Sequence, residues 1–156
     1  VFDWEKAEFH KGYIPNKSNS KAPSVPYTKE ENYINLQTAR GHNSFSGILG
    51  NGSVLMECDE RKNSELLPKI IEGEQLKFLV TDREGGQGIH SLFFDNGDFT
   101  QNYTEVTTAV GIVVDIKVGK RNGLECLKFN GNERFSIYNK STISGCTKVF
   151  KTPEGV

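Results

Sequence analysis

The sequence predicts an all-β fold: an antiparallel β-barrel or β-sandwich of about eight strands with one short helix. Four Asn-Gly pairs begin at Asn51, Asn96, Asn122 and Asn130. Both central residues of a type I′ hairpin need positive φ, which Asn and Gly adopt most easily. Several segments also alternate apolar and polar residues, whereas helical periodicity occurs once. Short strands marked off by tight turns, without helical crossovers, favour a barrel or a sandwich.

The N-terminal part is the least regular. Residues 11–32 contain three prolines, many small polar residues and no periodicity. They are expected to form an extended arm or a long loop, with Tyr13, Ile14 and Tyr27 packing against the rest of a single β domain that spans 1–156.

One segment has helical spacing. In residues 64–73, SELLPKIIEG, the apolar side chains recur at helical intervals and Gly73 is a plausible stop. Pro68 lacks the backbone N–H that a helix interior requires, so a helix of one or two turns is expected.

Two strands flank a glycine-rich loop. Residues 74–81 alternate, and GIHSLFF (88–94) is their expected partner. DREGGQG (82–88) is therefore predicted to be a hairpin loop. Its glycines match neither phosphate-loop spacing, and a strand rather than a helix follows, which argues against a phosphate-binding loop.

Three strands are predicted near the C-terminus. Residues 110–118 place apolar side chains at alternate positions with one exception, Val113. Segments 124–129 and 134–138 follow across two Asn-Gly turns, so an antiparallel meander is expected.

Composition narrows the functional classes. The chain has a net charge of −1, but residues 1–105 carry −5 and residues 106–156 carry +4. No apolar run approaches the roughly 20 residues of a membrane-spanning helix, so no membrane partner is expected. The three cysteines, Cys58, Cys126 and Cys146, lack metal-ligand spacing. Neither a cofactor nor a metal site is predicted.

The C-terminal cations carry the leading functional hypothesis. If neighbouring strands align them, they form one basic face interleaved with an aromatic ring, which is how β-barrels hold single-stranded nucleic acid. The sequence thus favours a non-catalytic binding module for an anionic ligand, preferably nucleic acid. The residues expected to bind are Lys117, Lys120, Arg121, Lys128, Arg134 and Tyr138.

Two alternatives remain open. A carbohydrate-binding, lectin-like module could stack a glycan on aromatic rings, and four N-x-S/T sites weakly suggest secretion. The candidate rings are Trp4, Tyr13, Tyr27, Tyr33 and Tyr103. A small hydrolase or transferase could instead use His42 and His90 as acid and base, if the fold brings them together.

Acidic side chains are also grouped. Glu57, Asp59 and Glu60 follow one apolar strand, while Asp95 and Asp98 flank a turn that could bind calcium but reads better as a hairpin. Asp115, Glu125 and Lys128 are similar to nuclease carboxylate–lysine sets. Cross-strand charge pairs on a solvated sheet explain them as well, so no catalytic residue is assigned.

Overall fold

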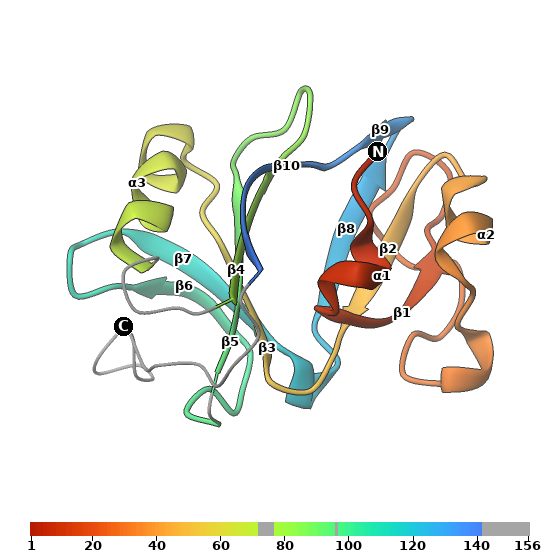
Figure 1. The fold of residues 1–156 in the computed structure, drawn as a ribbon, viewed down its shortest axis with the longest axis horizontal. Helices are drawn as coiled ribbons and strands as arrows, with labels where there is room; N and C mark the ends of the chain where they lie inside the picture. The colour runs from red at the N-terminus through yellow and green to blue at the C-terminus, as the bar shows by residue number, and fades with distance from the viewer. Residues whose placement is uncertain (72–76, 96, 142–156) are drawn as a thin grey trace.

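The computed structural model describes residues 1–71, 77–95 and 97–141, and its strands form two antiparallel sheets (Figure 1). The large sheet has the order β10-β4-β5-β3-β7-β6. Its strands are β3 (Ser53–Glu57), β4 (Lys77–Asp82), β5 (His90–Phe94), β6 (Tyr103–Thr107), β7 (Val113–Val118) and β10 (Phe135–Ser141). The small sheet has the order β1-β2-β8-β9. Its strands are β1 (His10–Pro15), β2 (Phe45–Leu49), β8 (Leu124–Phe129) and β9 (Asn132–Glu133).

The all-β prediction is confirmed, and the two sheets pack as layers without closing into a barrel. The helices are short: α1 (Trp4–Ala7), α2 (Leu36–Arg40) and α3 (Arg61–Ile71), with 3-10 turns η1 (Glu30–Asn32) and η3 (Gly119–Arg121). Within the described ranges, the helices fall short of the length and apolarity that a bilayer crossing requires.

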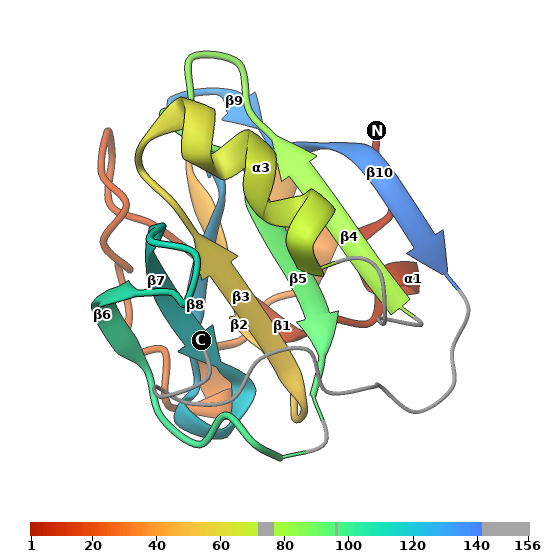
Figure 2. The same ribbon diagram turned by 90° about the vertical axis from the view of Figure 1, so that its left-hand side faces the viewer.

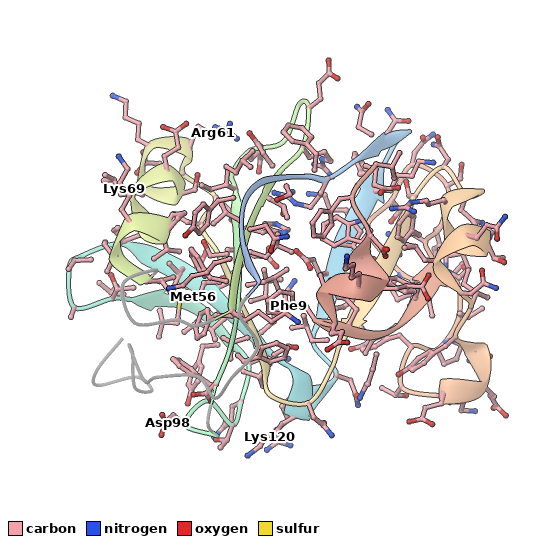
Figure 3. All side chains as sticks on the ribbon, in the orientation of Figure 1. Phe9, Met56, Arg61, Lys69, Asp98 and Lys120 are labelled. Atoms are coloured by element: carbon pink, nitrogen blue, oxygen red, sulfur yellow. The ribbon has the colours of Figure 1, made fainter. Side chains whose placement is uncertain are left out.

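The central strands of the large sheet, β3, β4 and β5, are buried on both faces. Helix α3 lies across one face (Figure 2), and the small sheet lies on the other side (Figure 1). Alternation along β3 divides its side chains accordingly: Val54 and Met56 join the core under α3, whereas Leu55 joins the core between the sheets. Leu79 of β4 and Leu92 of β5 point to the same side as Leu55.

Helix α3 is longer than predicted. It has 11 residues and contains Pro68, so the expected limit of one or two turns is wrong. Leu67 and Ile71 are buried against the large sheet, and this packing compensates for the hydrogen bond that Pro68 cannot donate.

The hairpin around DREGGQG is confirmed, since β4 and β5 pair antiparallel on either side of it. Strand β3 also pairs with β5, so β3 and β4 flank one strand and are joined through α3. This arrangement is a split β-α-β unit.

The predicted C-terminal meander is wrong, because β7 belongs to the large sheet and β8 to the small one. The chain crosses between the sheets at η3, where a Cβ on Gly119 would lie 1.6 Å from the Gly50 carbonyl oxygen. The chain also crosses between the sheets from β2 to β3, at Gly50. Only a glycine at position 119 allows these two crossings to contact each other. The Asn130-Gly131 turn does close a hairpin, β8–β9, with φ of 49° and 84° as a type I′ turn requires.

Part of the predicted N-terminal arm forms an edge strand of the small sheet. Strand β1 takes up residues 10–15 and pairs with β2, with Tyr13 and Ile14 buried. Beyond it, Asn16 and Pro23 form an isolated bridge, and Tyr27 is half-buried.

Candidate functional site

The space between the two sheets changes from apolar to polar at one end. Two residues beyond Leu55 on β3 lies Glu57, and two residues before Leu92 on β5 lies His90. Side chains two apart share a face of a strand, so Glu57 and His90 both point toward the small sheet. Register pairs Glu57 with His90 on one side and with Asp115 of β7 on the other. The fold therefore aligns three titratable side chains across neighbouring strands.

A cavity opens beside these residues, and we call it the basic cavity. Four cationic and two acidic side chains line it, together with His90. The lining comes from both sheets and from the loop between β4 and β5: Lys21, Glu57, Cys58, Asp59, Arg83, Gln87, Gly88, His90, Lys117, Leu124, Cys126 and Arg134.

Arg134 is the most deeply buried of these cations, at 3% exposure. Its Nε donates to Thr81 Oγ1 at 2.9 Å, and its Nη2 donates to the carbonyl oxygens of Thr81 and Gly88 at 2.9 and 3.2 Å. All three acceptors are neutral, and among the described residues no carboxylate forms an ion pair with it. Burial lowers the pKa of Arg134 from its ordinary value, although Glu125 opposes that shift.

The other cations differ in their partners. The guanidinium of Arg83 lies 5.1 Å from the centroid of the Phe129 ring, and Lys21 Nζ lies 5.5 Å from it. Lys117 instead lies 3.1 Å from Glu57 Oε1 and donates to the Leu124 carbonyl oxygen at 3.1 Å. Burial acts to lower the pKa of Lys117, but the nearby carboxylates outweigh it and the pKa is raised.

A second cavity adjoins the first, and its charged lining is entirely acidic. This acidic cavity shares Glu57, Cys58 and Asp59 with the basic cavity. Its remaining lining is Glu60, Asn63, Glu105, Gly111, Val113, Val114 and Asp115. The end of β3 thus forms a wall with cations on one side and carboxylates on the other.

Behind His90 lies a buried carboxylate that bridges two histidines. Glu125 of β8 places Oε2 2.7 Å from His90 Nδ1 and Oε1 2.7 Å from His10 Nε2. Glu125 is fully buried. Burial alone would raise its pKa, but the two histidines outweigh it and hold the pKa well below the usual range.

The loop between β4 and β5 approaches the end of β3 closely. A Cβ on Gly88 would lie 2.1 Å from the Cys58 carbonyl oxygen, so only a glycine fits there. This contact brings Arg83, Gln87 and His90 into the basic cavity.

The structure brings together two of the six residues predicted to bind an anion. Lys117 and Arg134 line the basic cavity. Lys120 and Arg121 lie exposed in η3, where Arg121 donates to the Thr100 carbonyl oxygen. Lys128 donates to the Arg40 carbonyl oxygen beside α2. Tyr138 lies on β10, in a separate groove beside α3.

Of the residues of the two alternative hypotheses, only His90 lines either of these cavities. Trp4 and Tyr13 are buried in the core, so neither ring offers a face to a sugar, whereas Tyr27, Tyr33 and Tyr103 are half-buried. His42 is exposed after α2. The histidine that shares a partner with His90 is His10.

Several site residues had little signal in the sequence. Glu57 and Asp59 are grouped in the sequence, and Glu125 belongs to a possible nuclease-like set, but no pattern in the sequence assigns Lys21 or Arg83 to a site. The alternation of β8 could have revealed Glu125, because it shares a face with the buried Leu127. Within the described part of the chain, no three His, Cys, Asp or Glu side chains are placed to hold a metal ion by themselves.

Comparison with known proteins gives no family for this chain. No family model matches the sequence, and neither the curated proteins nor the solved structures include a significant match.

Proposed function

We propose that the chain binds a nucleoside triphosphate with a divalent cation and transfers its nucleotidyl group to a nucleic-acid strand. The observation that carries this proposal is the wall formed by Glu57 and Asp59, with the basic cavity on one side and the acidic cavity on the other. A metal–triphosphate complex is complementary to this pair of cavities, because its anionic phosphates match the basic cavity and its cationic metal matches the acidic one.

The basic cavity suits a polyphosphate. A buried cation without a counter-ion is unfavourable, and Arg134 donates only to neutral oxygens among its described contacts. Phosphate oxygens would supply the missing negative charge. Arginine also matches phosphate with its planar donor fork, and Arg83 adds a second guanidinium to the same cavity.

The acidic cavity suits a cation that arrives with the phosphates. Magnesium is usually held by one or two carboxylates, water and the oxygens of a substrate phosphate. Such a site is incomplete without the nucleotide, which agrees with the incomplete ligand set among the described residues. Asp59 and Asp115 are the side chains that would hold it, because Glu57 is already ion-paired with Lys117.

The chemistry that follows is phosphoryl transfer. A strand's terminal hydroxyl oxygen would attack the α-phosphorus, and the bond from that phosphorus to the β-phosphate oxygen would break. Pyrophosphate leaves and the hydroxyl proton is released to water. Such reactions depend mainly on positioning and on neutralising charge, which the carboxylate-held cation, the arginines and His90 would provide.

A nucleic-acid acceptor is favoured by the rim of the basic cavity. Phe129 of β8 carries Arg83 and Lys21 beside its ring. Aromatic rings with adjacent cations are the usual platform for single-stranded nucleic acid. The expected basic face that includes Lys120 and Arg121 stays a prediction. It would bind the nucleic-acid strand where that strand extends beyond the basic cavity.

The test is nucleotide incorporation by the purified chain. With a primed single strand, labelled nucleoside triphosphates and Mg²⁺ or Mn²⁺, we expect strand extension and release of pyrophosphate. Asp59→Asn should lower the rate about a hundredfold. Asp3→Asn is the matched control, because Asp3 caps α1 and asparagine caps a helix equally well. Metal-independent binding, or transfer of the nucleotide only to water, would overturn the proposal.

A further inference from the structure

A hydrogen-bonded row of three side chains crosses from the small sheet to the basic cavity, and the first two are fully buried while the third is 13% exposed. His10 lies on β1, Glu125 on β8 and His90 on β5 of the large sheet. Both nitrogen–oxygen distances along the row are 2.7 Å. Only His90 reaches the basic cavity, where its Nε2 lies 3.8 Å from Glu57 Oε2.

His10 is enclosed by aromatic rings and by a glycine of the neighbouring strand. The side chain of His10 is fully buried, and the rings of Trp4 and Tyr13 lie 5.8 and 6.0 Å away, centroid to centroid. On β2, a Cβ at Gly47 would lie 2.5 Å from His10 Cδ2. Because Gly47 pairs with Glu125, its missing side chain leaves the space in which His10 reaches the carboxylate.

We propose that Glu125 is a positioning residue that holds the His90 ring with Nε2 toward the basic cavity. His10 in turn fixes Glu125 from the side away from that cavity. This inference rests on the proposed function, because it assigns His90 Nε2 to the phosphates of the bound nucleotide. Phosphate oxygens only accept hydrogen bonds, so in that complex Nε2 carries a proton as well as Nδ1, and the ring is cationic.

The proton inventory supports one arrangement. An ionised carboxylate can only accept hydrogen bonds, so both histidine nitrogens that face Glu125 carry protons. For His90 this places the proton on Nδ1 and directs Nε2 into the cavity. For His10 it places the proton on Nε2, while its Nδ1 is buried without a hydrogen-bond partner among the described residues. A proton on that Nδ1 would leave a buried donor unsatisfied, which is unfavourable.

The same inventory explains why a carboxylate is needed at position 125. A glutamine there offers one acceptor and one donor, so it cannot accept from both histidines. Among the described residues nothing accepts a proton from His10 Nδ1, so the change of tautomer would fall on His90. A positioning role therefore predicts a specific change at His90, whereas a merely structural role predicts only lower stability.

The first readout is the tautomer of His90 by long-range ¹⁵N NMR of the full chain. In the wild type we expect a proton on His90 Nδ1, and in Glu125→Gln we expect it on Nε2. Glu133→Gln is the matched control, since Glu133 is also a small-sheet carboxylate but binds Arg40 and Trp4 outside the cleft. The control should leave the His90 signals unchanged. A wild-type His90 without a proton on Nδ1 overturns the proposal without any variant.

The second readout is the affinity for a nucleoside triphosphate with Mg²⁺, measured by calorimetry. Glu125→Gln should weaken binding about tenfold, because a glutamine that donates to Nδ1 keeps the ring from carrying both protons and so removes a cationic donor to the phosphates. His10→Phe should weaken it in the same direction although His10 does not line the cavity. Unchanged affinity in both variants overturns the proposal. A wild-type chain with the expected tautomer that binds no triphosphate would instead refute the proposed function and leave the positioning of His90 standing.

Discussion

Replacing Asp115 by asparagine should stabilise the fold while it removes activity. Glu57 and Asp115 stand directly opposite each other on β3 and β7, and the charged side chains lining their acidic cavity are all carboxylates. Opposed side chains in a sheet lie roughly 5 Å apart at Cβ, and like charges there are destabilising. Asparagine keeps the acceptor for the Glu105 N–H, which donates to Asp115 Oδ1 at 2.8 Å. The variant therefore loses charge but no hydrogen bond.

The magnitude follows from Coulomb's law. Two unit charges about 5 Å apart repel by about 0.8 kcal/mol in water and by about 3 kcal/mol at an effective dielectric of 20. Lys117, 3.1 Å from Glu57, offsets part of this repulsion. We expect Asp115→Asn to raise the free energy of unfolding by about 1 kcal/mol, which for a chain of this size raises Tm by about 2–4 °C.

The assay compares urea unfolding with and without a ligand. At low salt Asp115→Asn should be more stable than the wild type, and 0.5 M NaCl should shrink the difference by screening. A nucleoside triphosphate with Mg²⁺ should stabilise the wild type but not the variant, since ligands stabilise only the state that binds them. Asp3→Asn should match the wild type throughout. If Asp115→Asn is less stable than the wild type, or keeps its response to the metal and nucleotide, then the carboxylates have been misassigned.

Three further predictions test the basic cavity and the residues packed around it. Gly88→Ala should lower the free energy of unfolding by about 1–3 kcal/mol in urea titrations, because its Cβ would lie 2.1 Å from the Cys58 carbonyl oxygen; unchanged stability would contradict that packing. Arg83→Ala should weaken triphosphate binding about tenfold in calorimetry, whereas Lys120→Ala should change it little; the reverse order would favour the exposed basic face. The pKa of Glu125 is lower in the folded than in the unfolded chain, so its contribution to stability is present above the ordinary value of 4.5 and is lost as pH falls below it. Glu125→Gln should therefore lose less stability than the wild type between about pH 5 and pH 3.

Local patterns in the sequence were enough to predict several of the strands but not their sheets. The segments that became β4, β5 and β8 were predicted from alternation, and the β8–β9 turn from Asn130-Gly131. The same dipeptide at Asn122 marks a crossing between sheets instead. The neighbouring sequence does not show which Asn-Gly pair forms a hairpin and which lies at a crossing. The crossing depends on the contact of Gly119 with Gly50, which is distant in the sequence.

The candidate site was predictable only in fragments, because it is assembled by long-range pairing. Lys117 and Arg134 were expected to bind an anion, and both line the basic cavity. For Glu125 the sequence offers a nuclease-like set or a charge pair on a solvated sheet, but its strand buries that face against the large sheet. Its partner His10 is 115 residues away in the chain, so no spacing in the sequence could have linked them.

The buried polar side chains of the cleft are hard to explain by stability alone. Replacing buried ionic groups by apolar side chains of similar volume is often neutral or stabilising. The fold already has two apolar cores, one under α3 and one between the sheets. The inter-sheet core could have continued past Leu55 and Leu92, yet the next positions on that face hold Glu57 and His90. Glu125 and Arg134 are buried around the same point, and an ordered, charged pocket is what phosphoryl transfer requires. The physical cost of this polar end is therefore best explained by the ligand that we propose it binds.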